Sequence, residues 1–315
     1  MDGFINLIFS DNLKEKDIKE ESKNCEEAIL FGWYRNTNEI KNLLFEIEKV
    51  KKVKENNSDD KVAVRELDAI LQHQIKLLNH YVLGSIYSDK SAILWYYKGK
   101  KEIITDRKVF NGVLSKICEE VYCNTPKYKN EMVNKTKISS QVATARRNLI
   151  RAVVENWSIK DLGFPDDKFP PEKTIYLSLL REAGIHISYN GGYILSEPNE
   201  RSFLDLWNVC NEFLENAKSE RRNLSELVEI LSSKPFKLKQ GFIDFWLPIF
   251  LFIKRDDFAL FCEGTYIPDI NDEVLDLVVR NTKDFEIKTF DIAGVKLDLF
   301  YKYRMLLNQA KQEKP

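Results

Sequence analysis

The stretch from Asp106 to Ser196 constrains the fold most, because it contains the pattern of three helices followed by a tight hairpin. Asp106 suits the N-cap of the first helix, and Pro171 stands where the first turn of the third helix tolerates proline. Gly184 ends that third helix, and the turn at Asn190-Gly191-Gly192 accepts positive φ. This order predicts a winged-helix module, which binds nucleic acid or a partner protein.

The C-terminal third repeats the scheme loosely, with helices followed by a hairpin that turns at Glu263-Gly264. The run from Phe242 to Ile253 is apolar on nearly every face, which is typical of a central core helix. It is also far shorter than the roughly 20 residues that span a bilayer. We therefore predict two tandem winged-helix-like units, residues 91–198 and 199–315, with a boundary near Pro198-Asn199.

The N-terminal part of the sequence alternates between strand and helix patterns. Ile5–Phe9 is an apolar strand pattern, Asn12–Ser22 a charged helix pattern and Ala28–Trp33 a second buried strand pattern. Strand, helix and strand in this order form half of a parallel α/β layer, and two strands are too few to bury their own faces. Residues 1–36 are therefore predicted to be an α/β remnant, the end of the sheet of a larger domain.

Residues 37–90 show helical periodicity with one polar break at Asn56–Asp60. This pattern predicts two long helices in an αα-hairpin that serves as a spacer. Its heptads are too irregular to predict a dimeric coiled coil. The chain as a whole is thus expected to be a mostly helical α+β protein, with the remnant and the spacer preceding the two winged-helix-like units.

Composition limits the possible functions. The chain has 315 residues, of which 43% are hydrophobic and 31% charged, as expected of a globular protein with about two domains. Because the formal net charge is −1, any nucleic-acid site must be a local patch. The five cysteines form no C-x-x-C pair and the three histidines are dispersed. These features predict a cytoplasmic chain with free thiols, without a metal ion, a cofactor or membrane contact.

The strongest local charge pattern runs from Lys127 to Arg151, where seven basic side chains accompany a single carboxylate, Glu131. Within it, one helix face carries four polar residues at helical spacing: Thr144, Arg147, Asn148 and Arg151. Such a surface suits phosphate groups. The candidate nucleic-acid-binding residues in this segment are Lys127, Lys129, Lys135, Lys137, Thr144, Arg146, Arg147, Asn148 and Arg151. The alternative is a solvated helix face that pairs with acidic neighbours elsewhere in the fold.

In a winged helix, the helix before the hairpin usually reads the bases, and here that helix is Glu172–Ala183. It adds Lys173 and Arg181 to the candidates, but it offers few other polar side chains. The sequence therefore favours contact with the backbone of double-stranded DNA over recognition of particular bases.

One pattern points to catalysis. A strand ending in Pro-Asp at Asp269, followed by Glu286-Ile287-Lys288, is the layout of a metal-dependent PD-(D/E)xK nuclease. Asp269 and Glu286 would hold Mg²⁺ and Lys288 would orient the attacking water. Pro-Asp is also a common turn pair, and no parallel sheet is predicted around it. No P-loop, dinucleotide-binding or H-E-x-x-H motif occurs, so a non-catalytic role is expected.

Three stretches share turn and packing residues with a known family: KISS (137–140) leading into ATARRNLI (143–150), PPEKTIYL (170–177) and FALFCEGTYIP (258–268). They resemble the C-terminal helical and winged-helix region of large bacterial P-loop ATPases of phage-defence type, such as those of BREX systems. The similarity covers residues 100–290.

In that family an ATPase domain precedes these segments, whereas this sequence contains neither the Walker A lysine nor a Walker B site. The resemblance implies a DNA-contacting or assembly module of a bacterial defence or restriction-related complex, with other protein subunits as partners. A purely protein–protein docking module is the alternative, and in that case the basic face would meet an acidic partner.

Overall fold

The computed structural model describes residues 3–10, 12–35, 37–86 and 93–289. The chain folds as a mostly helical α+β protein, as predicted. It divides into two compact units, residues 1–121 and residues 122–315. This division differs from the predicted domains. Residues 93–121 belong to unit 1, and residues on both sides of Pro198-Asn199 share one core in unit 2.

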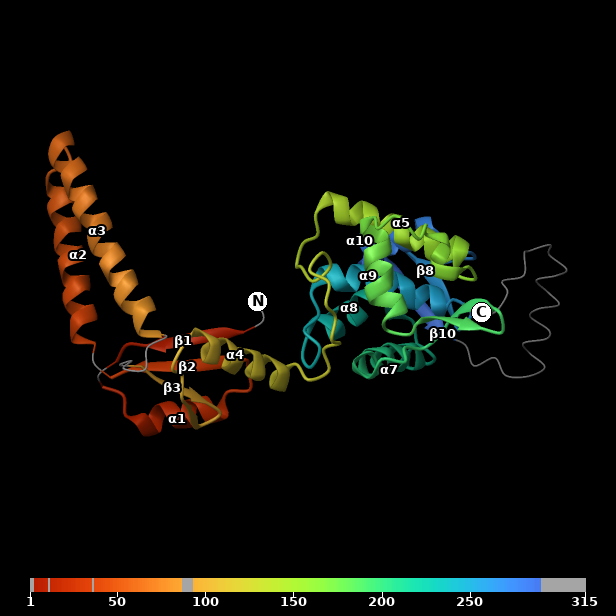
Figure 1. Cartoon of the computed structure of the whole chain (residues 1–315), viewed down its shortest axis with the longest axis horizontal. Coiled ribbons are helices and arrows are strands. Elements are labelled where there is room, and N and C mark those ends of the chain that lie inside the picture. The colour runs from red at the N-terminus through yellow and green to blue at the C-terminus, as the bar shows by residue number, and fades with distance from the viewer. Residues whose placement is uncertain (1–2, 11, 36, 87–92, 290–315) are drawn as a thin grey trace. The chain divides into compact units, whose positions relative to one another are not determined.

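Unit 1 contains a four-stranded sheet in the order β1-β2-β3-β4 (Figure 1). Strands β1 (Phe4–Ile8) and β2 (Ile29–Tyr34) are parallel and are joined by α1 (Glu15–Asn24), as the sequence predicts. Strands β3 (Ile93–Tyr97) and β4 (Lys100–Glu102) continue the sheet with antiparallel pairing. The α/β remnant is therefore extended within this chain by the β3–β4 hairpin, which lies in the range predicted for the first winged-helix-like unit, residues 91–198.

Helices cover both faces of this sheet. Ile18 of α1 packs with Phe31 and Tyr96 on one face. On the other face, the ring of Trp95 meets the edge of Phe110 from α4 (Arg107–Val121), with the ring centroids 5.4 Å apart. Gly32 pairs with Trp95 across the strands, and a Cβ at Gly32 would lie 2.6 Å from the tryptophan ring. The close approach of the indole therefore requires glycine at this position.

The predicted αα-hairpin is inserted between β2 and β3. It consists of α2 (Asn38–Asn56) and α3 (Lys61–Ile86), which run side by side away from the sheet (Figure 1). Near the turn, Lys54 and Asp68 form an ion pair at 2.6 Å. At the base, the Tyr34 hydroxyl donates to the carbonyl of Val82 and hydrogen-bonds the Ser85 hydroxyl. Ile86 is the one buried residue of α3 among the residues that the structure describes.

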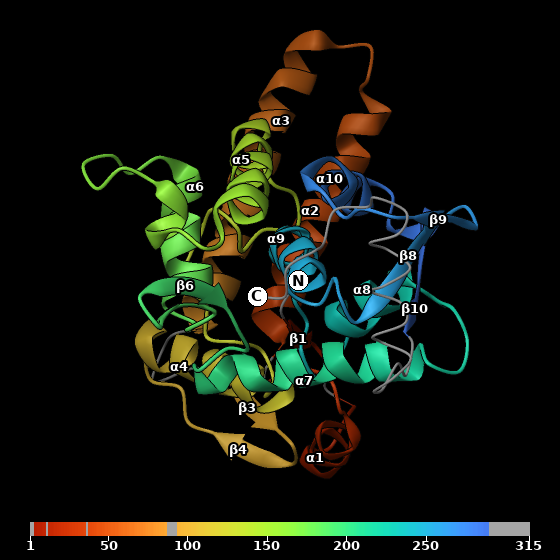
Figure 2. The same ribbon diagram turned by 90° about the vertical axis from the view of Figure 1, so that its right-hand side faces the viewer.

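Unit 2 is built around α9 (Gln240–Ile253), in which eleven of fourteen residues are buried, as predicted for a central core helix. Figure 2 shows α9 nearly end-on, with the other helices of unit 2 around it. The surrounding elements are α5 (Ser140–Asn156), a 3-10 turn (Lys160–Gly163), α6 (Pro171–Tyr176) with a π-helical turn (Leu177–Arg181), α7 (Arg201–Asn216), α8 (Leu224–Ser232) and α10 (Asp272–Arg280).

Two small sheets complete unit 2. The hairpin of β5 (His186–Tyr189) and β6 (Gly192–Leu195) forms where the sequence predicts it, with positive φ at Asn190 and Gly191. The second sheet has the order β7-β10-β8-β9. Its strands are β7 (Arg222–Asn223), β8 (Phe258–Cys262), β9 (Thr265–Ile267) and β10 (Phe285–Thr289), with a 3-10 turn at Thr282–Asp284. No helix in the described ranges is long and apolar enough to cross a bilayer.

Candidate nucleic-acid interface

The segment of residues 127–137, here called the basic segment, is irregular but firmly attached to unit 2. The Tyr128 hydroxyl and the Asn130 amide both hydrogen-bond the Ser178 hydroxyl, at 3.2 and 3.0 Å. Val133 is fully buried in the core. Gly241, at the start of α9, donates its backbone N–H to the Lys135 carbonyl at 2.8 Å. These anchors fix the path of the backbone.

The four lysines of this segment point outward between the anchors. Lys127, Lys129, Lys135 and Lys137 are all exposed. Within the described part of the chain, none of them forms an ion pair. Because the main chain is already ordered, contact with phosphates would order only the lysine side chains and would not add a cost for ordering the backbone. The basic segment is therefore the best-formed cationic surface predicted from the sequence.

Helix α5 begins directly after this segment. Ser139 is its N-cap, and the serine hydroxyl accepts a hydrogen bond from the backbone N–H of Val142 at 3.4 Å. The N-terminus of a helix carries a partial positive charge, which favours anions nearby. The helix dipole and Lys137 thus contribute positive potential at the same end of α5.

The outer face of α5 carries the predicted polar residues, and all four are exposed. Arg147 donates to the Thr144 hydroxyl at 3.2 Å. Two of the four meet carboxylates on neighbouring helices: Asn148 binds Glu172 at 3.1 Å, and Arg151 binds Asp272 at 3.1 Å. This face therefore matches, in part, the alternative of a polar helix surface paired with acidic neighbours.

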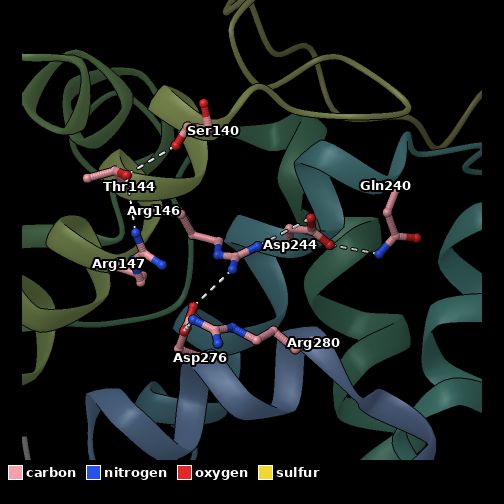
Figure 3. A network of polar contacts seen from close by, with 8 residues as sticks. All are labelled: Ser140, Thr144, Arg146, Arg147, Gln240, Asp244, Asp276 and Arg280. Atoms are coloured by element: carbon pink, nitrogen blue, oxygen red, sulfur yellow. Dashed lines mark hydrogen bonds and ion pairs between the residues drawn. The ribbon is translucent and has the colours of Figure 1, made fainter.

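Arg146 requires a correction. It is 7% exposed and lies in the core of unit 2, between carboxylates of two other helices (Figure 3). Its guanidinium contacts Asp276 of α10 at 2.9 Å and Asp244 of α9 at 3.4 Å. Arg280 also pairs with Asp276, and Gln240 donates to Asp244 at 2.7 Å. Burial raises the pKa of Asp244, although Gln240 and Arg146 oppose this effect. Arg146 is a structural residue, because its charge is paired with the carboxylates of Asp244 and Asp276 inside the protein.

Lys173 also requires a correction, because it is only 3% exposed. Its ammonium group donates to the carbonyls of Pro165 and Asp166 and lies 4.2 Å from the centre of the Phe169 ring. It therefore supports the loop before α6 and does not face solvent. Arg181 is half exposed, and its guanidinium binds Asp161 at 3.2 Å. Neither side chain is a free base-reading group.

A buried polar cluster beside this helix was missed by the sequence analysis. The Tyr176 hydroxyl lies 2.8 Å from Nδ1 of His186 and 3.1 Å from Asp161, and Nε2 of His186 lies 2.8 Å from the Trp157 carbonyl. Because a carbonyl only accepts, Nε2 of His186 carries a proton, and the Tyr176 hydroxyl donates to Asp161. Asp161 reaches the cluster through a backbone turn with a φ of 49°, which helical periodicity does not predict.

The three residues of the nuclease pattern are not brought together. Strand β8 separates β9 from β10, so Asp269, two residues beyond β9, is about 10 Å or more from Glu286 across the sheet. Glu286 lies 3.8 Å from Arg221, and Lys288 donates to the Lys218 carbonyl. In the described ranges, no group of three or more histidine, cysteine or acidic side chains is placed to hold a metal ion. The geometry does not support the nuclease alternative.

Comparisons with known proteins found no matching family model, no matching curated protein and no matching solved structure.

Proposed function

We propose that this chain is a non-catalytic module that contacts the phosphate backbone of double-stranded DNA through the basic segment. The observation that carries the proposal is the set of exposed, unpaired lysines on a backbone that is attached to the core at Asn130, Val133 and Lys135. Arg147, next to this segment on α5, adds a fifth exposed cation.

This arrangement suits phosphates better than bases. Lysine is a point charge that neutralises phosphate groups without reading sequence, and neutralisation releases condensed counterions from DNA. The helix before the β5–β6 hairpin supplies no free base-reading side chain, because Lys173 is buried and Arg181 is paired. The proposed contact is therefore independent of DNA sequence.

The proposal includes a setting. From the resemblance of residues 100–290 to phage-defence ATPases, we infer that the chain works with other protein subunits of a bacterial defence or restriction-related complex in the cytoplasm, where another chain supplies any ATPase activity. In this setting α5, α6 and the β5–β6 hairpin act as a winged-helix-like part that presents the basic segment.

The test is the fluorescence anisotropy of a labelled random-sequence duplex, titrated with the protein at several salt concentrations. We expect binding whose logarithmic salt slope falls by about 0.9 for every phosphate contact that is removed. The variant carries Lys127→Glu, Lys129→Glu, Lys135→Glu and Lys137→Glu. A control with the same change in charge carries Lys160→Glu, Lys168→Glu, Lys237→Glu and Lys283→Glu, at exposed positions elsewhere in unit 2.

Loss of binding in the basic-segment variant, with retention in the control, would support the proposal. Equal losses in both variants would show that only the net charge matters. If the unmodified protein does not bind at low salt, DNA contact is overturned, and protein docking becomes the working function.

A further inference from the structure

An open pocket lies in unit 2, where the end of α9 meets α7 and the chain that follows β6. Its volume is about 370 Å³, which is within the range of small-molecule sites and gives room for about a dozen non-hydrogen atoms. The polar residues that line it are Glu197, Trp207, Asn211, Lys254, Asp256 and Asp257. The pocket shares no residue with the basic segment or with the carboxylates around Arg146, so neither of those roles accounts for it.

Trp207 is a fixed wall of this pocket and has an unused polar group. The residue is 4% exposed, and its ring makes T-shaped contacts with Trp246 and Phe250 of α9, with ring centroids 6.3 and 5.3 Å apart. Its indole N–H makes no hydrogen bond in the described part of the chain, and it is not enclosed by protein as the indole nitrogen of Trp95 is. Because buried donors are nearly always paired, this N–H is available to an acceptor that enters the pocket.

Two more polar groups lie on the same side of the pocket. Asn211 follows Trp207 by one turn of α7, so the two side chains share a helix face. Asn211 is half-buried, and its amide makes no hydrogen bond with the residues that the structure describes. The Lys254 ammonium group lies 5.4 Å from the centre of the Trp207 ring. An indole N–H, an amide and an ammonium group thus form a wall rich in hydrogen-bond donors.

Carboxylates outnumber cations around the pocket. Glu197, Asp256 and Asp257 are all exposed, and Asp257 pairs with Lys254 at 3.3 Å. Three carboxylates against one ammonium group leave a formal charge of −2 on the lining residues. Arg255, which adjoins Asp256 in sequence, is buried and does not line the pocket. The C-terminal end of α9 adds the negative end of its helix dipole at the same place.

We propose that this pocket binds arginine, either as the free amino acid or as a residue of a partner peptide. The guanidinium group meets the carboxylates, because its rigid fork of N–H donors matches carboxylate oxygens and serves more than one acid at once. The acceptor of the ligand, a free carboxylate or a peptide carbonyl, takes the hydrogen bonds of Trp207 and Asn211. The proposal does not depend on DNA contact, since the pocket and the basic segment share no residue.

The first test follows the indole N–H signals of the ¹⁵N-labelled full chain by NMR. The chain has five tryptophans, so Trp207→Phe identifies the signal of Trp207, and the remaining signals show whether the fold is intact. Titration with L-arginine should shift this signal until it saturates, with a Kd of about 1 mM or tighter, as expected of so small a ligand. L-Citrulline has the same shape without the charge and should bind at least tenfold more weakly. No shift of the Trp207 signal, or an equal response to citrulline, would overturn the proposal.

The carboxylates are tested by neutral substitutions of the same shape. Glu197→Gln/Asp257→Asn should weaken arginine binding at least tenfold, because the guanidinium loses two of its acceptors. A matched control, Asp167→Asn/Glu229→Gln, removes the same charge at two exposed positions elsewhere in unit 2 and should bind arginine normally. Equal affinity of the two double variants would overturn the assignment of the site.

The source of the arginine is decided by a third ligand, N-acetyl-L-arginine amide, which has peptide carbonyls but no free carboxylate. Binding as tight as that of L-arginine, or tighter, would support an arginine residue of a partner peptide. Binding that is at least tenfold weaker would support the free amino acid, since the carboxylate is then needed by Trp207 and Asn211. If neither compound binds, the pocket is not an arginine site.

Discussion

Arg146 holds three helices of unit 2 together. Its planar guanidinium reaches one carboxylate on α9 and another on α10, and Asp276 is shared with Arg280 at the surface (Figure 3). Its Nε atom is buried and makes no hydrogen bond in the described part of the chain. A buried ion pair adds little net stability compared with an apolar replacement of the same shape. Removing one partner is costly, however, because an uncompensated charge stays in the core.

We therefore predict that Arg146→Ala lowers the free energy of unfolding of unit 2 by about 3–5 kcal/mol, since Asp244 and Asp276 lose their shared counter-ion. Arg147→Ala, the next residue along the helix, should change it by no more than about 0.5 kcal/mol because that side chain is exposed. Urea denaturation followed by circular dichroism measures both. Equal effects of the two substitutions would contradict the structural role of Arg146.

Arg146 and Arg147 show what helical spacing can and cannot predict about single residues. Spacing correctly places Thr144, Arg147 and Arg151 on one exposed face. It does not reveal that Arg146 is buried, because the acids that pair with it lie 98 and 130 residues further along the chain. A basic residue that turns inward looks the same in sequence as one that turns outward.

At the level of elements, the start of α9 positions the basic segment. Gly241 lies against the backbone of this segment, and a Cβ at Gly241 would be 2.5 Å from the Val133 carbonyl oxygen and 2.7 Å from that of Lys135. The same glycine donates its N–H to the Lys135 carbonyl. The contact is therefore steric and polar at once, and it leaves no room for a side chain.

Gly241→Ala should consequently push the basic segment away from α9. We expect a loss of stability of about 1–3 kcal/mol from overpacking, together with weaker DNA binding, because the lysines lose their fixed backbone. Thermal unfolding and the anisotropy titration measure the two effects. As a control, Gly112→Ala on α4 meets open space, so it should raise stability by up to about 1 kcal/mol and leave DNA binding unchanged. Normal DNA affinity of Gly241→Ala would show that the order of the segment is unimportant for binding.

Individual elements were largely predictable, but their partners were not. The αα-hairpin, the β5–β6 hairpin and the buried helix α9 all follow from local periodicity and turn residues. The pairing of β2 with β3 does not, because the whole α2–α3 hairpin separates the two strands in sequence. A strand pattern specifies which side chains face a core, but it does not specify which strand will pair with it.

At the scale of the whole molecule, the two units have separate hydrophobic cores and should unfold in separate transitions. The tandem arrangement predicted from the sequence missed this division, because the helix Arg107–Val121 has the same local pattern whether it joins the sheet of unit 1 or the helices of unit 2. The transition of unit 2 can be recognised as the one that Arg146→Ala lowers. The two transitions then allow an effect of pH to be assigned to one unit.

Unit 2 should lose stability in acid through His186. Burial lowers the pKa of its imidazole below the ordinary value of 6.5, while the Trp157 carbonyl and Asp161 act in the opposite direction. Because the unfolded state therefore binds a proton more readily, the contribution is present above pH 6.5 and is lost as the pH falls below it. Each unit of pKa difference corresponds to about 1.4 kcal/mol.

Calorimetry between pH 7.5 and pH 5 should therefore show the unit 2 transition moving to lower temperature as the pH falls. In His186→Gln this movement should be smaller, because glutamine keeps a donor and an acceptor without titrating. Asp244, whose pKa is raised by burial, titrates in both proteins and so does not affect their difference. An equal shift in both proteins would show that His186 does not set the acid response. A larger fall of the transition in His186→Gln than in the unmodified protein would contradict the lowered pKa of the His186 imidazole.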